Sequence, residues 1–178
     1  MSSDQQPASD PTIATTPGPT ETDGTGKNVS DLPAETIDFA NRIFDAAREG
    51  NSELLLAAVD AGLPVNLTNT KGNTLLMLAA YAGHADLTKE LLKRGADPDR
   101  LNDLGQSMIA GAVFKAHDDV VKILVEHGAN PRLGTPNAVQ AAHVFNRKEI
   151  MVLLGTKEED RDKEVPFNLP TVGPGFGA

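Results

Sequence analysis

The chain has 178 residues, a hydrophobic content of 39% and an aromatic content of only 4%. This length predicts one domain with flanking tails, and the scarcity of aromatic residues predicts a core of Leu, Ala, Val and Ile. The formal net charge of −9 argues against nucleic acid or an anionic membrane as the main partner, because both select a basic surface. The absence of Cys excludes disulfides and thiolate metal sites.

Residues 1–31 are predicted to form a disordered N-terminal tail. The segment is rich in Thr, Ser, Pro and Gly and holds few apolar side chains, so it cannot bury enough surface to offset the entropy of ordering. It has neither the basic nor the apolar region of a secretion signal. No stretch of the chain approaches the ~18 apolar residues that suggest a membrane-spanning helix. We therefore expect a cytoplasmic protein.

The sequence repeats itself between residues 32 and 155. Gly62, Gly95 and Gly128 lie 33 residues apart, and Asn69–Pro98 aligns with Asn102–Pro131 without a gap. A constant period of this size predicts a small unit that is copied and stacked. The predicted units cover residues 33–65, 66–98, 99–131 and 132–155.

The second unit shows most clearly how each unit is built. A turn at Asn69–Gly72 precedes Thr74, whose hydroxyl can cap a first helix with the sequence LLMLAAYA. Gly83 ends that helix, and a second helix with the sequence DLTKELLKR follows, with its leucines on one face. Lys93 and Arg94 lie in the last turn, where cations complement the helix dipole. The repeating glycine then supplies the left-handed residue that stops the helix.

The other units predict the same pairs of helices. In the third unit, Ser107 caps MIAGAVFK, and DDVVKILVEH forms the second helix. Further helices are expected at about Pro33–Glu49, Ser52–Ala61, Asn137–Phe145 and Lys148–Leu154. The turn before the last pair is about three residues shorter than the earlier turns. The final unit is therefore expected to be atypical, as terminal repeats usually are.

Residues 156–178 are predicted to form a second tail. A mixed-charge run, TKEEDRDKE, precedes a part that is rich in Pro and Gly. The apolar side chains of that part are Val165, Phe167, Leu169, Val172 and Phe176. Two interpretations remain open: the segment folds back over the last unit around Ile150 and Leu153, or it is a linear motif for another protein.

These units resemble the ankyrin repeat. Gly72–Ala80 stands where that family has G-x-T-P-L-H-x-A-A, and Gly83–Leu87 matches its G-H-x-E/D-hydrophobic segment. Leu91–Asp97 matches its L-L-x-x-G-A-D ending, which Val125–Asn130 repeats. The resemblance covers about residues 33–155. It implies an all-α ankyrin-repeat solenoid of about four helix-turn-helix repeats between disordered N- and C-terminal tails.

The chain departs from the family pattern at two kinds of position. Thr74–Met77 and Ser107–Ala110 stand in place of T-P-L-H, so the hydrogen bonds that the family's His usually supplies are missing. Gly111 lies inside a predicted helix, where it should cost about 0.5–1 kcal/mol relative to Ala. We therefore expect Gly111→Ala to leave stability undiminished, unless the site is too crowded for a methyl group.

No catalytic residue, metal site or cofactor site is predicted, and we do not expect an enzyme. His84 and His117 recur in register, but equivalent positions on neighbouring helices lie about 8–10 Å apart, too far to share one small ion. The resemblance implies that these histidines tie loops together. Asp97, Asp99 and Asp103 lack the other ligands of a calcium loop and are interpreted as solvated turn residues.

The candidate binding site is a stripe that runs across the units. In ankyrin-like stacks, the position two or three residues before the mid-unit Gly lies on the exposed inner face of the first helix. Tyr81 and Phe114 occupy it, and they either anchor a partner or lie half-buried against each other and stiffen the stack. The predicted partner-binding residues are Arg48, Lys71, Asn73, Tyr81, Leu104, Gln106, Phe114, Lys115, Val144 and Phe145.

The resemblance implies a non-catalytic protein–protein interaction module that binds a partner protein through its concave face, as a monomer. Because such a scaffold is preformed, little ordering entropy is lost on binding. Two alternatives remain open. One is an inhibitor or immunity-like regulator of an enzyme, with which the acidic charge is compatible. The other is an accessory stabiliser of a stress-response enzyme such as catalase.

Overall fold

The computed structural model describes residues 34–157 and Asp160, so the predicted N-terminal tail and most of the predicted C-terminal tail lie outside the described residues. The chain divides into two compact units between Asp38 and Phe39. Of the first unit, only residues 34–38 are described. The described residues form α-helices and turns, with two isolated β-bridges. The helices are α1 (Ala34–Glu49), α2 (Ser52–Asp60), α3 (Leu75–Ala82), α4 (Ala85–Lys93), α5 (Met108–Lys115), α6 (Asp118–Glu126), α7 (Ala138–Val144) and α8 (Lys148–Leu153).

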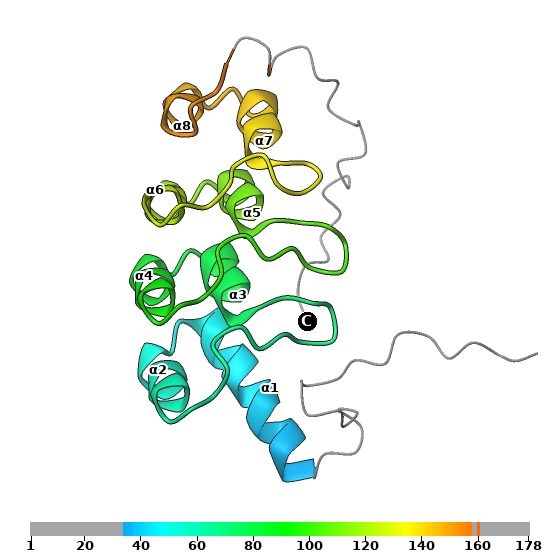
Figure 1. Cartoon of the computed structure of the whole chain (residues 1–178), viewed down its shortest axis with the longest axis vertical. Helices are drawn as coiled ribbons and strands as arrows, with labels where there is room; N and C mark the ends of the chain where they lie inside the picture. The colour runs from blue at the N-terminus through cyan, green and yellow to red at the C-terminus, as the bar shows by residue number, and fades with distance from the viewer. Residues whose placement is uncertain (1–33, 158–159, 161–178) are drawn as a thin grey trace, which may run out of the picture. The chain divides into compact units, whose positions relative to one another are not determined.

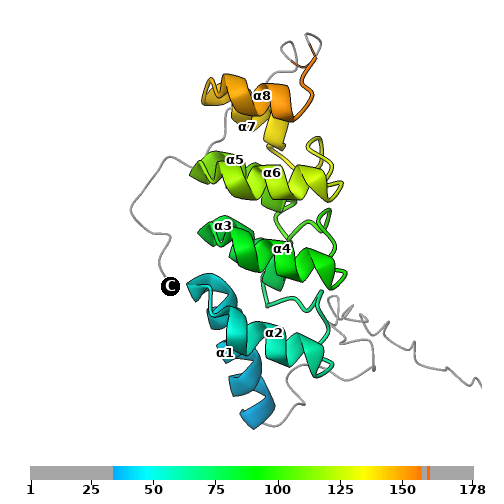
Figure 2. The same ribbon diagram turned by 90° about the vertical axis from the view of Figure 1, so that its left-hand side faces the viewer.

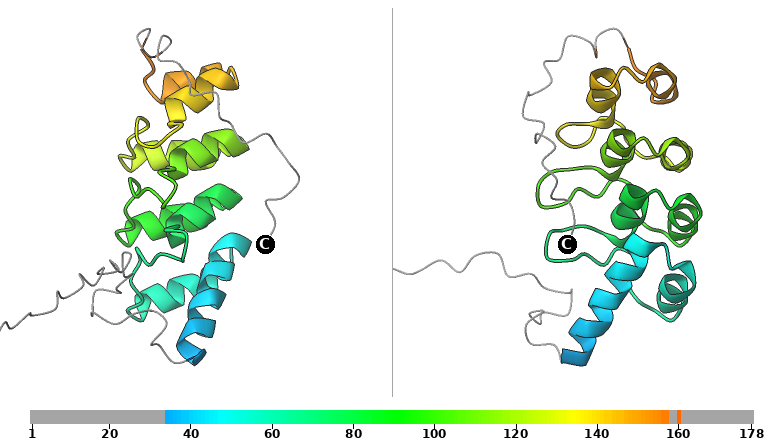
Figure 3. Two further views of the ribbon diagram at one scale, coloured as in Figure 1. Left: turned by 90° about the vertical axis from the view of Figure 1, so that its right-hand side faces the viewer. Right: turned by 180° about the vertical axis from the view of Figure 1, so that it is seen from behind.

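The helices from α3 onward are arranged in two layers within the second unit. α3, α5 and α7 stack in one layer, and α4, α6 and α8 stack beside them (Figure 1). The second layer faces the viewer in Figure 2. The turns that join successive helix pairs project from the first layer, on the side away from the second (Figures 1 and 3). The stacked helix pairs predicted from the 33-residue period are thus present.

Each of α3, α5 and α7 begins at a polar residue whose side chain caps the helix. Thr74 Oγ1 accepts a hydrogen bond from the Met77 amide at 3.1 Å, and Ser107 Oγ accepts one from the Ala110 amide at 3.4 Å. Asn137 and Gln140 form a capping box, in which the side chain of each accepts a hydrogen bond from the backbone amide of the other. These bonds satisfy amides that have no partner inside the helix, so the short helices have defined starts.

The second helices end at left-handed glycines, as predicted, but the first helices do not all do so. Gly95 and Gly128 have φ values of 87° and 84°, and Gly83 after α3 has 86°. After α5 the same conformation is adopted by Ala116, with φ of 63°, and after α7 by Asn146, with φ of 50°. A β-carbon is crowded in this conformation, so Ala116 holds the helix end at a local cost.

The core between the layers is aliphatic, as the composition predicts. The largest fully buried side chains include Ile43, Leu55, Leu75, Leu76, Leu91, Met108, Ile109 and Leu124. Among the buried hydrophobic residues of the described part, Phe44 is the one aromatic. Phe114 and Phe145 lie instead on the surface, with 39% and 43% of their areas exposed. The stack therefore does not use these two rings to fill its core.

Side chains at one recurring position join the start of a repeat to its end. Asn66 Oδ1 accepts a hydrogen bond from the Asp97 amide at 2.9 Å, and 33 residues later Asp99 Oδ1 accepts one from the Asn130 amide at 2.7 Å. The interpretation of Asp99 as a merely solvated turn residue is therefore wrong. Its carboxylate joins the start of the third repeat to its end, because it satisfies a backbone donor there.

The next residue in this series is Arg132, and its side chain donates instead of accepting. The guanidinium bonds the Asp160 carboxylate at 2.9 Å and the Gly155 carbonyl at 3.3 Å. The same carboxylate accepts a bond from the Lys157 amide at 2.8 Å, and Asp160 is 8% exposed. These bonds fix the chain beyond α8 to the start of the fourth repeat.

Candidate protein-binding surface

The projecting turns are closed by asparagine side chains at their bases. Asn69 Oδ1 accepts hydrogen bonds from the amide of Lys71 and from the amide two residues further on, both at 3.0 Å. Asn102 Oδ1 repeats this arrangement. It accepts hydrogen bonds from the backbone amide of Leu104 at 3.1 Å and from that of Gln106 at 2.9 Å. The turns are thus held in shape while the side chains at their tips face solvent. Lys71 is exposed, and Leu104 is 76% exposed.

Two of the predicted turn-tip residues have a structural role that the sequence analysis missed. Asn102 Nδ2 donates hydrogen bonds to Asn73 Oδ1 at 3.0 Å and to Gln106 Oε1 at 2.9 Å. The first of these bonds joins the turns of neighbouring repeats. Asn73 is half-buried, whereas Gln106 is exposed. The side-chain oxygen of Asn73 therefore takes part in the contact between neighbouring turns, and that of Gln106 is held within its own turn.

Tyr81 on α3 lies against the next repeat. A methyl group at Gly111 would be 2.9 Å from the Cδ2 atom of the Tyr81 ring, and the ammonium of Lys115 lies 4.9 Å from the ring centroid. The ring is half-buried by these contacts. The site is thus too crowded for a methyl group, which is the exception named above to the expectation that Gly111→Ala leaves stability undiminished. The absence of a side chain there lets the tyrosine approach α5 closely.

Phe114 and Phe145 form an aromatic pair between the third and fourth repeats. Their ring centroids are 5.5 Å apart and the ring planes meet at 74°, an edge-to-face geometry. Val144 precedes Phe145 and is 41% exposed. Tyr81 is half-buried, whereas Phe114 is exposed and contacts Phe145. We call Tyr81, Phe114, Lys115, Val144 and Phe145 the aromatic surface.

Arg48, the predicted site residue nearest the N-terminus, is occupied in two ways. Its guanidinium pairs with Asp45 at 2.6 Å, and its carbonyl oxygen bonds Nε2 of His84 at 2.8 Å. That second bond joins the first and second repeats through their loops, which is the role that the resemblance implied for His84.

The recurring histidines also pack on glycines of the preceding repeat. A methyl group on Gly50 would lie 2.6 Å from the ring of His84, and one on Gly83 would lie 2.7 Å from the ring of His117. Across residues 34–157 and Asp160, no group of three or more His, Asp or Glu residues could hold a metal ion.

In the fourth repeat, Arg147 takes the position of these histidines. Its Nη1 donates to the carbonyl of Val113 at 3.2 Å, and its Nη2 lies 2.6 Å from both carboxylate oxygens of Asp118. The link to the preceding repeat is therefore kept, but it is made by a charged side chain. The three-residue shortening of the last turn hides this equivalence when the sequence is counted in steps of 33.

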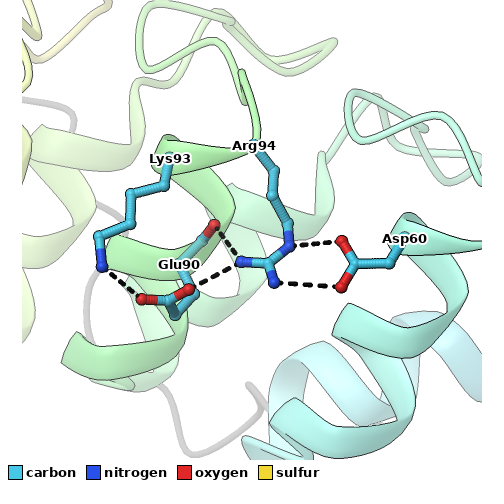
Figure 4. A network of polar contacts seen from close by, with 4 residues as sticks. All are labelled: Asp60, Glu90, Lys93 and Arg94. Carbon is cyan, nitrogen blue, oxygen red and sulfur yellow. Dashed lines mark hydrogen bonds and ion pairs between the residues drawn. The ribbon is translucent and has the colours of Figure 1, made fainter.

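A charged network joins the second helices of the first two repeats (Figure 4). Arg94 donates to both carboxylate oxygens of Asp60, at 2.8 and 3.1 Å, and to Glu90 at 2.7 Å. Glu90 also accepts a bond from Lys93 at 2.6 Å. Arg94 does bond the carbonyl of Glu90 at 3.1 Å, as expected of a cation near a helix end, but it also reaches the preceding repeat.

The network shifts the ionisation of its members. The hydrogen bond from Arg94 lowers the pKa of Asp60, and the hydrogen bonds from Lys93 and then Arg94 lower the pKa of Glu90. The bonds to Asp60 and then to Glu90 raise the pKa of Arg94. All three shifts favour the charged forms.

The fold and this surface define a helical repeat protein. A family model described as ankyrin repeats in three copies matches residues 43–135, more than half of the chain. The chain belongs to the ankyrin repeat family. In the part of the chain that the structure describes, no helix combines the length and apolar character needed to cross a membrane.

Known proteins match parts of the chain. An ankyrin repeat protein of Pseudomonas aeruginosa is 51% identical over 59 residues, which are 33% of this chain and 34% of the relative. Human ankyrin repeat domain-containing protein 29 is 48% identical over 54 residues, 30% of this chain and 18% of that protein. The crystal structure of the human ASB11 ankyrin repeat domain matches with a TM-score of 0.61 and 26% identity, over 70% of this chain and 57% of that one. The chain thus covers about a third or less of the two curated relatives.

Proposed function

We propose that the protein is a non-catalytic module that binds a partner protein through the aromatic surface and the neighbouring turn tips. Ankyrin repeats generally mediate protein–protein interactions, which supports the class of function. One observation carries the choice of surface. Phe114 contacts Phe145, Val144 precedes Phe145 in the chain, and Phe114, Phe145 and Val144 are 39%, 43% and 41% exposed, respectively. Clustered exposed rings are typical of the centres of protein interfaces.

The contacts beneath the surface favour binding because they order it in advance. Tyr81 is held between Gly111 and Lys115, and the edge-to-face contact holds Phe114 against Phe145. A partner therefore meets side chains whose rotamer freedom is already reduced. The entropy lost on association is smaller than for freely rotating rings.

The proposal is tested with a Phe114→Ala, Phe145→Ala variant. Val152→Ala is the control, because Val152 is 81% exposed on α8, in the other layer. Partners captured by the wild-type chain from a cell extract are identified, purified and titrated against all three proteins. Losing two anchoring rings should weaken binding by about tenfold or more, since an anchoring residue contributes at least about 1–2 kcal/mol. The control should bind as the wild type does.

Retention of every partner by the folded double variant would contradict the proposal. Circular dichroism and denaturant titration first establish that the variant folds, because the lost ring pair contributes about 0.5–1.5 kcal/mol.

The activity of a captured enzyme separates the alternative roles. An inhibitor lowers that activity when the module is added, a stabiliser prolongs it during heating, and a passive scaffold changes neither.

A further inference from the structure

The aromatic surface combines apolar side chains with a neighbouring cation. Phe114, Val144 and Phe145 expose apolar area, and the ammonium of Lys115, the residue after Phe114, lies over the ring of Tyr81. Lys115 is itself exposed. Such a surface suits a short apolar segment that carries carboxylates beside it, because the segment would cover the rings and place its charges near the ammonium.

The last described residue, Asp160, is held against the start of the fourth repeat. Arg132 holds the Asp160 carboxylate at 2.9 Å, and the Lys157 amide donates to the same group at 2.8 Å. Val144 and Phe145 belong to this repeat as well. Phe167 is the seventh residue after Asp160, an extended reach of about 23 Å. Because stacked helices lie about 8–10 Å apart, that reach spans the third and fourth repeats.

The sequence that follows this fixed point has the matching chemistry. Asp162 and Glu164, with Lys163 between them, directly precede the apolar stretch that contains Phe167 and Leu169, and this run has one more acidic residue than basic. Pro166 and other prolines in the stretch limit the backbone conformations available before binding, so less entropy is lost when the segment docks. The acidic residues would face Lys115 while the apolar side chains cover the rings.

We propose that residues 162–176 bind the aromatic surface of their own molecule and occupy it until a partner displaces them. A tethered segment acts at an effective concentration in the millimolar range, so even a weak contact is populated. The occupancy itself does not depend on any partner. Its consequence, that the tail competes with partners, rests on the proposed function.

The occupancy is tested on the full chain by a spin label at its end. The chain has no Cys, so Ala178→Cys gives a single attachment point for a nitroxide. Amide signals of Phe114, Val144 and Phe145 should broaden more than that of Val152 on α8. Phe167→Ser with Leu169→Ser should abolish this difference. The matched control, Ile13→Ser with Val29→Ser in the N-terminal segment, should leave it unchanged.

Three results would overturn the proposal. The broadening can be absent or uniform, it can persist in the Phe167→Ser, Leu169→Ser variant, or it can be strongest around Ile150 and Val152, which would place the segment on α8 instead. A fourth result would come from a mixed sample, in which one set of chains carries the spin label and another set carries the isotopes for the amide signals. Equal broadening in that sample means that the segment binds a second copy.

Binding to a purified partner tests the competition separately. If the tail occupies the surface, Phe167→Ser with Leu169→Ser should strengthen partner binding, whereas the N-terminal control should not. A positive spin-label result without any partner affected by Phe114→Ala and Phe145→Ala would leave the occupancy standing and refute the proposed function. The two proposals therefore fail in distinguishable ways.

Discussion

At the level of single residues, the packing of Tyr81 accounts for the presence of a glycine at position 111. From the sequence, Gly111 is a helix-weakening residue and Tyr81 a prospective anchor, and nothing in the pattern connects them. In the structure the ring occupies space that a β-carbon at Gly111 would need, at 2.9 Å from Cδ2. Gly111 thus leaves room for the Tyr81 ring. The helix propensity that the glycine lowers is exchanged for a packed contact between repeats.

This pairing predicts that the effect of Gly111→Ala depends on Tyr81. In the wild-type chain, the added methyl should destabilise the fold by about 1–3 kcal/mol through overpacking. In a Tyr81→Ala background, the same change should stabilise it by about 0.5–1 kcal/mol, because only the helix propensity remains. Denaturant titration of the four proteins in a double-mutant cycle measures the coupling. An equal effect of Gly111→Ala in both backgrounds would refute the pairing.

Among the helices, α4 contains a buried polar group that its counterpart lacks. Thr88 is fully buried, and among the described residues its hydroxyl has no hydrogen-bond partner. Val121 occupies the equivalent position on α6 and is also fully buried. The two side chains have nearly the same shape, so the hydroxyl is desolvated at α4 without compensation.

Thr88→Val should therefore stabilise the protein by about 1–2 kcal/mol, the cost of leaving one buried donor or acceptor unsatisfied. The midpoint of denaturant unfolding should rise while the slope stays constant. Thr70→Val, in an exposed turn, is the control and should change stability little. A loss of stability in Thr88→Val would indicate that the hydroxyl is bonded in solution.

The sequence predicts those features of the helices that are caused by residues within the same turn. The bounds of α3 follow from Thr74 and Gly83, because a cap and a left-handed glycine act within one turn. The left-handed conformation of Ala116 does not follow, since an alanine disfavours it.

The same distinction holds at the candidate site. Register along the chain predicts that Phe114, Val144 and Phe145 share a face. It does not predict that Asn102 bonds Asn73 or that Arg147 replaces a histidine. The partners in these bonds lie 29 and 34 residues apart in the chain. Whether they bond depends on the length and direction of the side chains in the folded stack, which a pattern of residue types does not give.

For the whole molecule, the Arg94 network makes the attachment of the first repeat to the second depend on pH. The folded-state pKa values of Asp60 and Glu90 lie below their ordinary values of 3.8 and 4.5. A lowered carboxyl pKa contributes stability above the ordinary value and loses it as the pH falls. The network therefore stabilises the stack at neutral pH and stops doing so in acid.

Arg94→Met keeps an aliphatic side chain and removes the charge. The difference in unfolding free energy between this variant and the wild type should be constant near pH 7, shrink as the pH falls below about 4.5, and be smaller in high salt. Denaturant titrations at several pH values measure it. A difference that stays the same down to about pH 3 would show that Arg94 acts by packing and not by charge.

The position of the ring pair at one end of the described stack has a further consequence. Within the described residues, α7 packs on α5 and α8, and α8 packs on α6 and α7, so the fourth repeat meets one neighbouring repeat instead of two. In a linear stack, such a unit opens more readily than the inner ones. Phe145 detaches from Phe114 whenever it opens. The affinity of the aromatic surface is thus scaled by the fraction of molecules whose last repeat is closed, so stabilising that repeat would tighten binding without adding a contact.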